Sequence, residues 1–548
     1  MSNIWKTKPL EKLLNEASED EKGLKRSLSS GALVALGIGA IIGAGLFSLT
    51  GIAAAEHAGP AVTLSFVVAA IGCAFAGLCY AEFASMIPVA GSAYTYSYAT
   101  MGEFMAWIIG WDLVLEYALG AATVGVSWSR YFLELLNKFG IHLPNSLICS
   151  PWETLKLGDG TVVEGGIVNL PAIIIVSLLS LLLIRGTKES AGMNNFLVVL
   201  KVAVVILFIA LGWSYMNPEN HTPFIPENKG IFGQFGWSGI MAGAATVFFA
   251  FIGFDAVSTA AQEAKNPQKG MPIGILGSLV ICTILYVLFS YVMTGLANYT
   301  EFHNDAKPAA TAFAKTPYGF LQTGLIVAIL AGYTSVILVM LMGQSRVFYS
   351  MSRDGLLPKF FGEIHSKFRT PWKTNLFFLV FVSLFAGFVP VSDLGHMVSI
   401  GTLLAFSLVC VGVMVMRKTQ PNAKRTFRTP FVPFVPIAGI VVCVALMASL
   451  PGESWLRLFI WMMIGLDIYL FRGIKNSFLG KEKNTTADPK NYWFTSMVGF
   501  ILTVGLLLLT YFHHQASGDS DMPLVYFSLA MAAFHLIYYG YYIITHRK

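Results

Sequence analysis

Three ionisable residues lie inside long apolar stretches of this 548-residue chain. Lys201 interrupts NNFLVVLKVAVVILF, Glu116 stands in WDLVLEYALG, and Asp255 follows FFAFIGF. A charge at the centre of a hydrocarbon layer costs at least about 2.5–3.5 kcal/mol on insertion scales. If these stretches cross a membrane, the three residues are candidates for a proton relay, an ion site or a substrate contact.

Each of the three also has a simpler interpretation. Lys201 could extend its amine to the membrane interface, although it stands near the middle of its apolar run. Asp255 could cap the helix that follows it. Glu116 could contact the substrate's side chain, pair with Lys201, or face another helix, and a carboxylate in the pocket would favour cationic substrates.

Clustered glycines are a second feature of interest, because they can interrupt a helix and leave backbone N–H and C=O groups without helical partners. The stretch GALVALGIGAIIGAGLF, residues 31–47, has four glycines near its middle: Gly37, Gly39, Gly43 and Gly45. Glycine inside a helix costs about 0.5–1 kcal/mol relative to alanine. Broken backbone at membrane depth is tolerated only where it is buried in protein or lines a cavity. We therefore expect this span to unwind at its centre; the alternative is close helix packing through small residues.

A second apolar stretch is interrupted in a similar way. The segment WSGIMAGAATVFFAFIGFDAVSTAAQEAKNPQKG carries Gly253 in its apolar run, two residues before Asp255. Interrupted apolar segments at corresponding places in two halves of a chain point to the binding site of a secondary transporter.

The elements that position these residues are membrane-spanning helices. The chain is 55% hydrophobic and 12% charged, whereas soluble domains average about 25% charged residues. With about 20 apolar residues per span, we expect fourteen spans, at residues 31–55, 62–87, 103–133, 167–184, 191–213, 237–262, 272–297, 318–345, 374–390, 394–416, 432–450, 455–471, 492–512 and 522–545.

The distribution of positive charge gives the orientation. With residue 1 in the cytoplasm, 28 of the 36 Lys and Arg residues fall on the cytoplasmic side, and Lys201 lies within a span. The remaining 7 fall on the outer side when Arg130 and Arg457, close to the outer ends of their spans, are counted there. This is the positive-inside asymmetry. We therefore expect a multi-pass protein of the plasma (inner) membrane with both termini in the cytoplasm.

The predicted organisation is an all-α chain with two similar halves. Residues 1–30 form a cytoplasmic segment, 31–213 contain helices 1–5, 237–416 contain helices 6–10, 432–545 contain helices 11–14, and 546–548 form a cytoplasmic tail. Because five is odd, the two halves start on opposite sides, which permits an inverted repeat.

The sequence contains no signature of an enzyme or of a nucleotide-driven pump. The six cysteines have no disulfide or metal-ligand spacing, the histidines are scattered, and no phosphate-binding glycine loop is present. We expect no cofactor, no metal site, no catalysis and no nucleic-acid partner.

Four motifs in order resemble the cationic amino acid transporter family of the amino acid–polyamine–organocation superfamily, in its bacterial form. They are GIGAIIGAGLF, FFAFIGFDAVSTAAQEAKNPQKGMPIGI, GQSRVFYSMSRDGLLP and SIGTLLAFSLVCVGVMVMR. The resemblance implies a five-plus-five inverted repeat of the leucine transporter type, with four extra helices.

The resemblance also implies a substrate site at the two breaks. The carbonyls of Ile41, Phe249, Ala250 and Ile252 would hold the α-ammonium, and the N–H groups of Ala44 and Gly45 would hold the α-carboxylate, with Gly43 and Gly253 as the flexible positions. Many relatives have Ser or Thr where Ala44 stands, so here the carboxylate would rely on backbone alone. Helix C-termini favour cations and N-termini favour anions, which suits a zwitterion.

The resemblance assigns coupling and gating to the three ionisable residues. Lys201 would replace the Na⁺ that sodium-coupled superfamily members hold between spans 1, 5 and 8, and is a candidate carrier of the coupled proton. Asp255 and Glu116 would be gating, proton-sensitive or substrate-contacting residues.

The function that follows is proton-coupled symport of L-amino acids, with small neutral ones such as alanine favoured and a broad range allowed. The alternative is a sodium-independent uniporter or exchanger of arginine and lysine, and a less favoured one is a non-transporting amino acid receptor. The expected partners are the amino acid, a proton and membrane lipids. A small transmembrane partner at helices 11–14 is left open.

Overall fold

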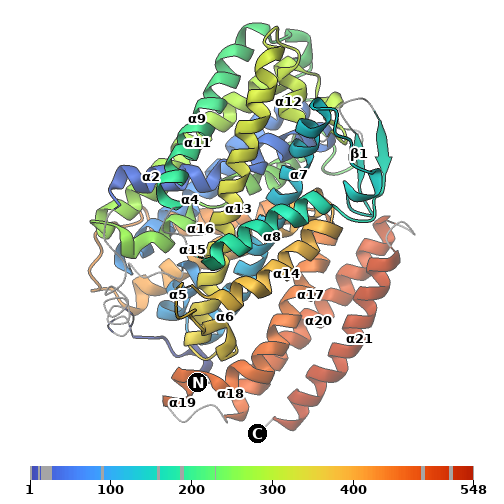
Figure 1. Ribbon diagram of the computed structural model, residues 1–548. Helices are drawn as coiled ribbons and strands as arrows, with labels where there is room; N and C mark the ends of the chain where they lie inside the picture. The colour runs from blue at the N-terminus through green and yellow to red at the C-terminus, as the bar shows by residue number, and fades with distance from the viewer. Residues whose placement is uncertain are drawn as a thin grey trace.

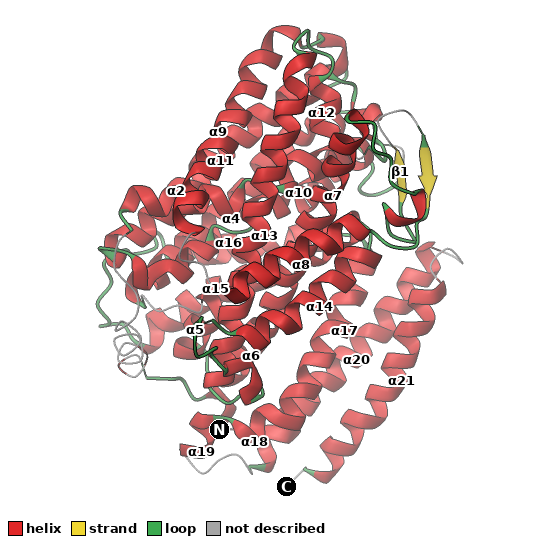
Figure 2. Cartoon of the chain, viewed as in Figure 1, coloured by secondary structure: helices red, strands yellow, loops and turns green. Residues whose placement is uncertain are grey.

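The chain folds almost entirely into helices in the computed structural model (Figures 1 and 2). The structure describes residues 3–9, 11, 13, 28–87, 92–156, 161–185, 190–228, 230–305, 307–368, 370–482, 488–517 and 522–546. Most of the predicted N-terminal segment and residues 547–548 of the predicted tail lie outside the described residues.

The α-helices follow one another along the whole chain. They are α2 (Ser30–Ile41), α3 (Thr50–Ala53), α4 (Val62–Met86), α5 (Ser92–Thr100), α6 (Glu103–Val114), α7 (Gly120–Lys138), α8 (Leu170–Arg185), α9 (Ser190–Gly212), α10 (Gly236–Val247), α11 (Pro267–Leu296), α12 (Pro308–Phe313), α13 (Gln322–Arg353), α14 (Trp372–Phe388), α15 (Val391–Thr419), α16 (Phe434–Ala448), α17 (Gly452–Ile468), α18 (Ile474–Asn476), α19 (Phe478–Glu482), α20 (Pro489–Ser517) and α21 (Met522–Thr545). Two short antiparallel strands, β1 (Thr154–Lys156) and β2 (Val162–Glu164), form a hairpin in the long loop after α7.

The membrane-spanning character expected from the sequence is present. Within the described residues, ten helical segments are long and apolar enough to cross a membrane. Four shorter apolar helices, α2, α8, α14 and α16, lie at predicted spans 1, 4, 9 and 11. Every predicted span therefore coincides with helix, although length and composition alone do not establish the count of fourteen. The inverted repeat stays a prediction.

The predicted break in the first span is present. Helix α2 ends at Ile41, Ile42 is extended with ψ at 106°, and helical structure resumes at Gly45 as a five-residue π-helix. The freed backbone lies between two short half-helices, so span 1 presents both a helix C-terminus and a helix N-terminus at its centre.

The sixth span breaks in the same manner. Helix α10 ends at Val247 and passes through a 3-10 turn at Phe248–Phe251 to an extended Ile252. Gly253 has φ at +113°, which L side chains rarely adopt. A second 3-10 segment then runs through Asp255–Glu263. Glycine is therefore required at residue 253 by the backbone conformation itself.

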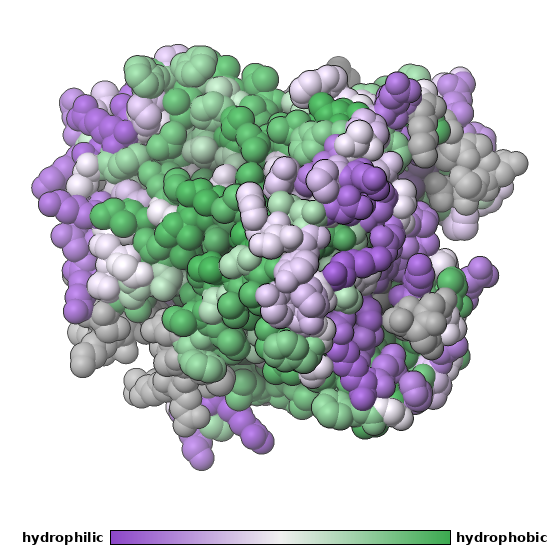
Figure 3. Space-filling model, turned by 90° about the horizontal axis from the view of Figure 1, so that it is seen from above, coloured by the Kyte–Doolittle hydropathy of each residue, from purple (hydrophilic) through white to green (hydrophobic). Residues whose placement is uncertain are grey.

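The surface is apolar where lipid is expected to cover it. Seen from above, hydrophobic side chains fill the middle of the molecule and hydrophilic ones gather toward its margins (Figure 3). Helices α20 and α21 pack on each other and α20 packs on α17, at one side of the molecule (Figure 1). Many large apolar side chains on these helices are exposed, as expected for a lipid-facing surface.

Candidate functional site

The two broken spans touch each other at their breaks. A Cβ on Gly45 would overlap the backbone of Ala250, and a Cβ on Gly253 would come within 2.9 Å of the Ala40 carbonyl oxygen. The absence of side chains at these two glycines therefore lets the backbones of spans 1 and 6 approach closely. The result is a buried point where main-chain groups from both breaks converge.

Two of the carbonyls expected to hold an ammonium meet at one hydroxyl. The Tyr286 hydroxyl of α11 lies 2.9 Å from the carbonyl oxygen of Ile41 and 2.9 Å from that of Ala250. Sequence reasoning missed Tyr286, because an isolated tyrosine in the apolar run ICTILYVLFSYV gives no signal of function.

The other expected backbone groups differ in how free they are. The Phe249 carbonyl already accepts the Ile252 N–H at 3.2 Å. The Gly43 carbonyl accepts the N–H groups of Leu46 and Phe47. Within the described part of the chain, the N–H groups of Ala44 and Gly45 donate to no protein acceptor. Two N–H groups at the start of the second half of span 1 are thus left without a protein acceptor in the described chain.

Lys201 is buried among three spans and does not extend to an interface. Its side chain is 1% exposed, and its Nζ donates to the Gly39 carbonyl at 2.7 Å. Gly39 lies in the last turn of α2, where carbonyls lack helical partners. A Cβ on Gly332 of α13 would lie 3.2 Å from the Lys201 Cγ. The lysine therefore sits between spans 1, 5 and 8.

Asp255 and Glu116 form a buried carboxyl pair. Both residues are 0% exposed and lie close to each other, but neither carboxyl oxygen of Glu116 has a hydrogen-bond partner in the described chain. Burying two carboxylate charges side by side is costly. Asp255 accepts the Tyr117 hydroxyl and, at 3.4 Å, the Ser92 hydroxyl. The structure thus brings spans 3 and 6 and helix α5 together at one cluster of buried polar side chains.

The simpler interpretations of the two acids were a helix cap for Asp255 and an ion pair with Lys201 for Glu116. Asp255 is the first residue of its 3-10 segment, in which Phe254 takes the N-cap position and no side-chain capping bond is present. Among the described residues no ion pair joins Glu116 to Lys201. One turn before Glu116, Asp112 is also fully buried, and neither of its oxygens has a hydrogen-bond partner in the described chain.

Ion pairs on the predicted cytoplasmic side tie the helix ends together. Glu82 of α4 accepts a bidentate bond from Arg417 of α15, with both distances at 2.8 Å, and a further bond from Arg425 at 3.1 Å. The N-terminal segment is also fastened, because the Lys8 ammonium lies 2.9 Å from Asp354.

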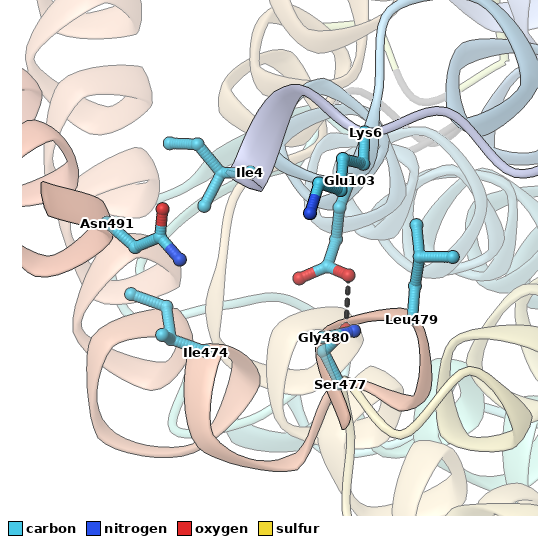
Figure 4. A pocket seen from close by; sticks show the side chains of 8 residues that line it. All are labelled: Ile4, Lys6, Glu103, Ile474, Ser477, Leu479, Gly480 and Asn491. Carbon is cyan, nitrogen blue, oxygen red and sulfur yellow. Dashed lines mark hydrogen bonds between the residues drawn. The ribbon is translucent and has the colours of Figure 1, made fainter. Parts of the chain in front are cut away.

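Glu103 lies in a small pocket beneath the N-terminal segment (Figure 4). Its carboxylate accepts hydroxyls from Tyr98, Tyr469 and Ser477. The pocket volume is about 10 Å³, so it holds at most one water molecule. Glu103 is therefore a structural junction between span 3 and the segment after α17.

A larger cavity of about 770 Å³ lies near the predicted outer ends of spans 1 and 6. Its lining includes Glu56, His57, Thr246 and His303. Thr246 stands one turn before Phe249 on span 6. The wall of this cavity at Thr246 therefore lies one helical turn from the break in span 6.

The amino-acid sequence is similar to those of known membrane transporters. The chain is 45% identical over 479 residues to the branched-chain amino acid permease BcaP of Bacillus subtilis (strain 168), covering 87% of this chain and 99% of that protein. It is 42% identical to the methylthioribose transporter of the same organism, covering 88% and 100%. It is 37% identical to cationic amino acid transporter 4, vacuolar, of Arabidopsis thaliana, covering 77% and 68%. The amino acid permease family model matches residues 28–466, and the chain therefore belongs to the amino acid permease family of membrane transporters.

Proposed function

We propose that the protein imports neutral L-amino acids with the help of a proton gradient and without Na⁺. The observation that carries the proposal is the hydrogen bond of 2.7 Å from the Lys201 ammonium to the Gly39 carbonyl. A tethered positive charge already occupies the position between spans 1, 5 and 8. Na⁺ would have to displace it, at the cost of burying a second cation beside the first.

The proposed substrate is an amino acid because the site consists of backbone groups of both kinds. The carbonyls of Ile41 and Ala250 suit an ammonium, and the N–H groups of Ala44 and Gly45 suit a carboxylate. Such contacts select the zwitterionic part and leave the side chain unspecified.

The proposed range extends from alanine to the branched-chain amino acids. Gly and Ala at the breaks leave the pocket apolar and uncharged near the backbone site. Two of the relatives, in Bacillus subtilis and Lactococcus lactis, are named branched-chain amino acid permeases. Because another similar relative is named for methylthioribose, that sugar is included in the test as a competing substrate.

The coupled proton has two candidate carriers. Lys201 could lose its proton when span 1 moves and the Gly39 bond breaks. The second candidate is the pair of neighbouring buried carboxyl groups, Glu116 and Asp255. Substitutions of Lys201, of Glu116 and of Asp255 distinguish the two carriers.

A second candidate function is transport of arginine and lysine. Neither carboxyl oxygen of Glu116 has a hydrogen-bond partner in the described chain. An ionised carboxyl group here would offer a negative charge to a cationic side chain. Cationic amino acid transporters are among the similar proteins, which makes this alternative worth testing.

The membrane arrangement belongs to the proposal as well. We place the protein in the plasma membrane with both termini in the cytoplasm, on the strength of the positive-inside distribution. Residues 31–213 and 237–416 are proposed as the two inverted repeats, because each contains one broken span. Helices 11–14 would then contact lipid or a small transmembrane partner.

The experiment is uptake into proteoliposomes in Na⁺-free buffer. Labelled L-leucine, L-alanine, L-arginine and methylthioribose are each supplied with and without an inward proton gradient. We expect leucine and alanine to accumulate, and the accumulation to collapse with a protonophore. Arginine uptake that follows membrane potential and ignores the pH gradient would favour the second candidate. Uptake of methylthioribose alone would contradict both.

A further inference from the structure

Tyr286 is fixed in place at the meeting point of the two broken spans. It comes from α11 and is 0% exposed. The rings of Phe66 and Phe251 lie against it, with centroid distances of 5.4 Å and 5.3 Å. Because packing holds the ring on two sides, the position of its hydroxyl is set by the core and not by the substrate.

The hydroxyl cannot satisfy both carbonyls that it contacts. A phenol carries one hydrogen, and it stands 2.9 Å from both the Ile41 and the Ala250 carbonyl oxygens. At any moment it donates to one of them. The hydroxyl oxygen and the two carbonyl oxygens therefore converge with only one hydrogen among them. Each carbonyl oxygen has two lone pairs and can accept a further hydrogen bond. This arrangement favours a ligand that brings several N–H donors.

We infer that Tyr286 is a positioning residue for the α-ammonium of the substrate, an inference that rests on the proposed amino acid transport. Charged N–H donors bind oxygen at about 2.7–2.9 Å, close to the 2.9 Å at which the hydroxyl holds each carbonyl. The hydroxyl therefore keeps the two carbonyls at the spacing that an ammonium needs. Binding then costs less reorganisation, because the acceptors are already in place.

The inference assigns a role in specificity as well. The site selects a primary ammonium, because an amine with fewer N–H groups leaves one converging oxygen without a donor. An unsatisfied buried acceptor costs about 1–3 kcal/mol. The side chain of the substrate plays no part at this point, so the effect of Tyr286 is the same for every amino acid.

The test compares Tyr286→Phe with a matched control in reconstituted full-length protein. Tyr539→Phe is the control, because Tyr539 of α21 is equally buried and donates to one main-chain carbonyl, that of Met463, at 3.1 Å. The KM and the maximal rate are measured for leucine, valine and alanine. For Tyr286→Phe we expect KM to rise about tenfold, by the same factor for all three, with the maximal rate within about threefold. Tyr539→Phe should change neither quantity.

Three results would overturn the inference. They are an unchanged KM, a fall in maximal rate alone, or a change in KM that differs among the three side chains. The KM is independent of how much of the variant folds, so a poor yield does not obscure it.

Native protein provides a second measurement. N-methyl-L-leucine should compete with labelled leucine about tenfold less well than leucine does, and equal competition would contradict the inference. If native protein transports no amino acid at all, the proposed function fails, and the inference, which rests on it, fails with it. If native protein transports leucine but the KM is unchanged in Tyr286→Phe, only the inference fails.

Discussion

The Lys201 ammonium lies 2.7 Å from the Gly39 carbonyl oxygen and joins span 5 to the inner half of span 1. The bond is charge-assisted and fully buried, so it is among the stronger polar contacts that a helix end can form. It ties the unwound part of span 1 to a helix of the surrounding scaffold. If this part of span 1 moves, therefore, either the bond breaks or Lys201 moves with it.

Replacing Lys201 with methionine should abolish accumulation driven by a proton gradient, with a loss of about tenfold or more. Methionine keeps the length and burial of the side chain but leaves the Gly39 carbonyl without its donor. Proteoliposome uptake measures the effect. Lys138→Met serves as control, because Lys138 lies at the outer end of α7 and contacts the polar side chains of Gln322 and Thr323. Full gradient-driven transport by the Lys201 variant would show that this lysine is a structural charge.

Neutralising the carboxyl pair should separate coupling from substrate exchange. Glu116→Gln and Asp255→Asn both keep hydrogen-bonding capacity but prevent the exchange of a proton. If the pair carries the coupled proton, each variant should lose its response to external pH. Exchange of labelled for unlabelled leucine should stay within about threefold of native protein. A native pH profile in Asp255→Asn would instead support a role limited to capping.

The ion pairs of Glu82 with Arg417 and Arg425 should stabilise the folded protein. Removing one partner of a buried ion pair costs about 3–5 kcal/mol, whereas an exposed pair contributes about 0–1 kcal/mol. Glu82→Gln leaves Arg417 and Arg425 without their carboxylate, so we expect a clear fall in the melting temperature of detergent-solubilised protein. Glu363→Gln breaks the half-exposed pair with Lys373 and should change little. Equal melting temperatures for the two variants would contradict a stabilising role of the Glu82 ion pairs.

Cys149 should resist thiol reagents in the native protein. It is fully buried beneath the hairpin loop, and burial, with Glu153 nearby, raises the pKa of its thiol to about 11. The thiolate is the reactive form, so its fraction near pH 8 is about one in a thousand and grows about tenfold for each pH unit up to the pKa. Peptide mass spectrometry after maleimide treatment should find Cys149 unmodified at pH 8 and modified after unfolding. Rapid native labelling would mean that the loop is open.

The sequence by itself determined the class of protein, its membrane-spanning helical character and the two backbone breaks. Membrane-spanning helices follow from long apolar runs, because hydrocarbon leaves the backbone no partners but its own. The break at Ile41–Ala44 followed from clustered glycines, since this effect is local to the chain. The family resemblance likewise rested on contiguous motifs, and it is confirmed by the amino acid permease family match.

Only the tertiary structure decided which distant groups meet. The bond from Lys201 to Gly39 joins residues 162 positions apart, and the contact from Tyr286 to Ile41 joins residues 245 apart. The position of Glu116 near Asp255, with no ion pair to Lys201 in the described chain, depends on how spans 3, 5 and 6 rotate and cross. Packing sets those rotations through shape complementarity between helices, which no local pattern in the chain encodes.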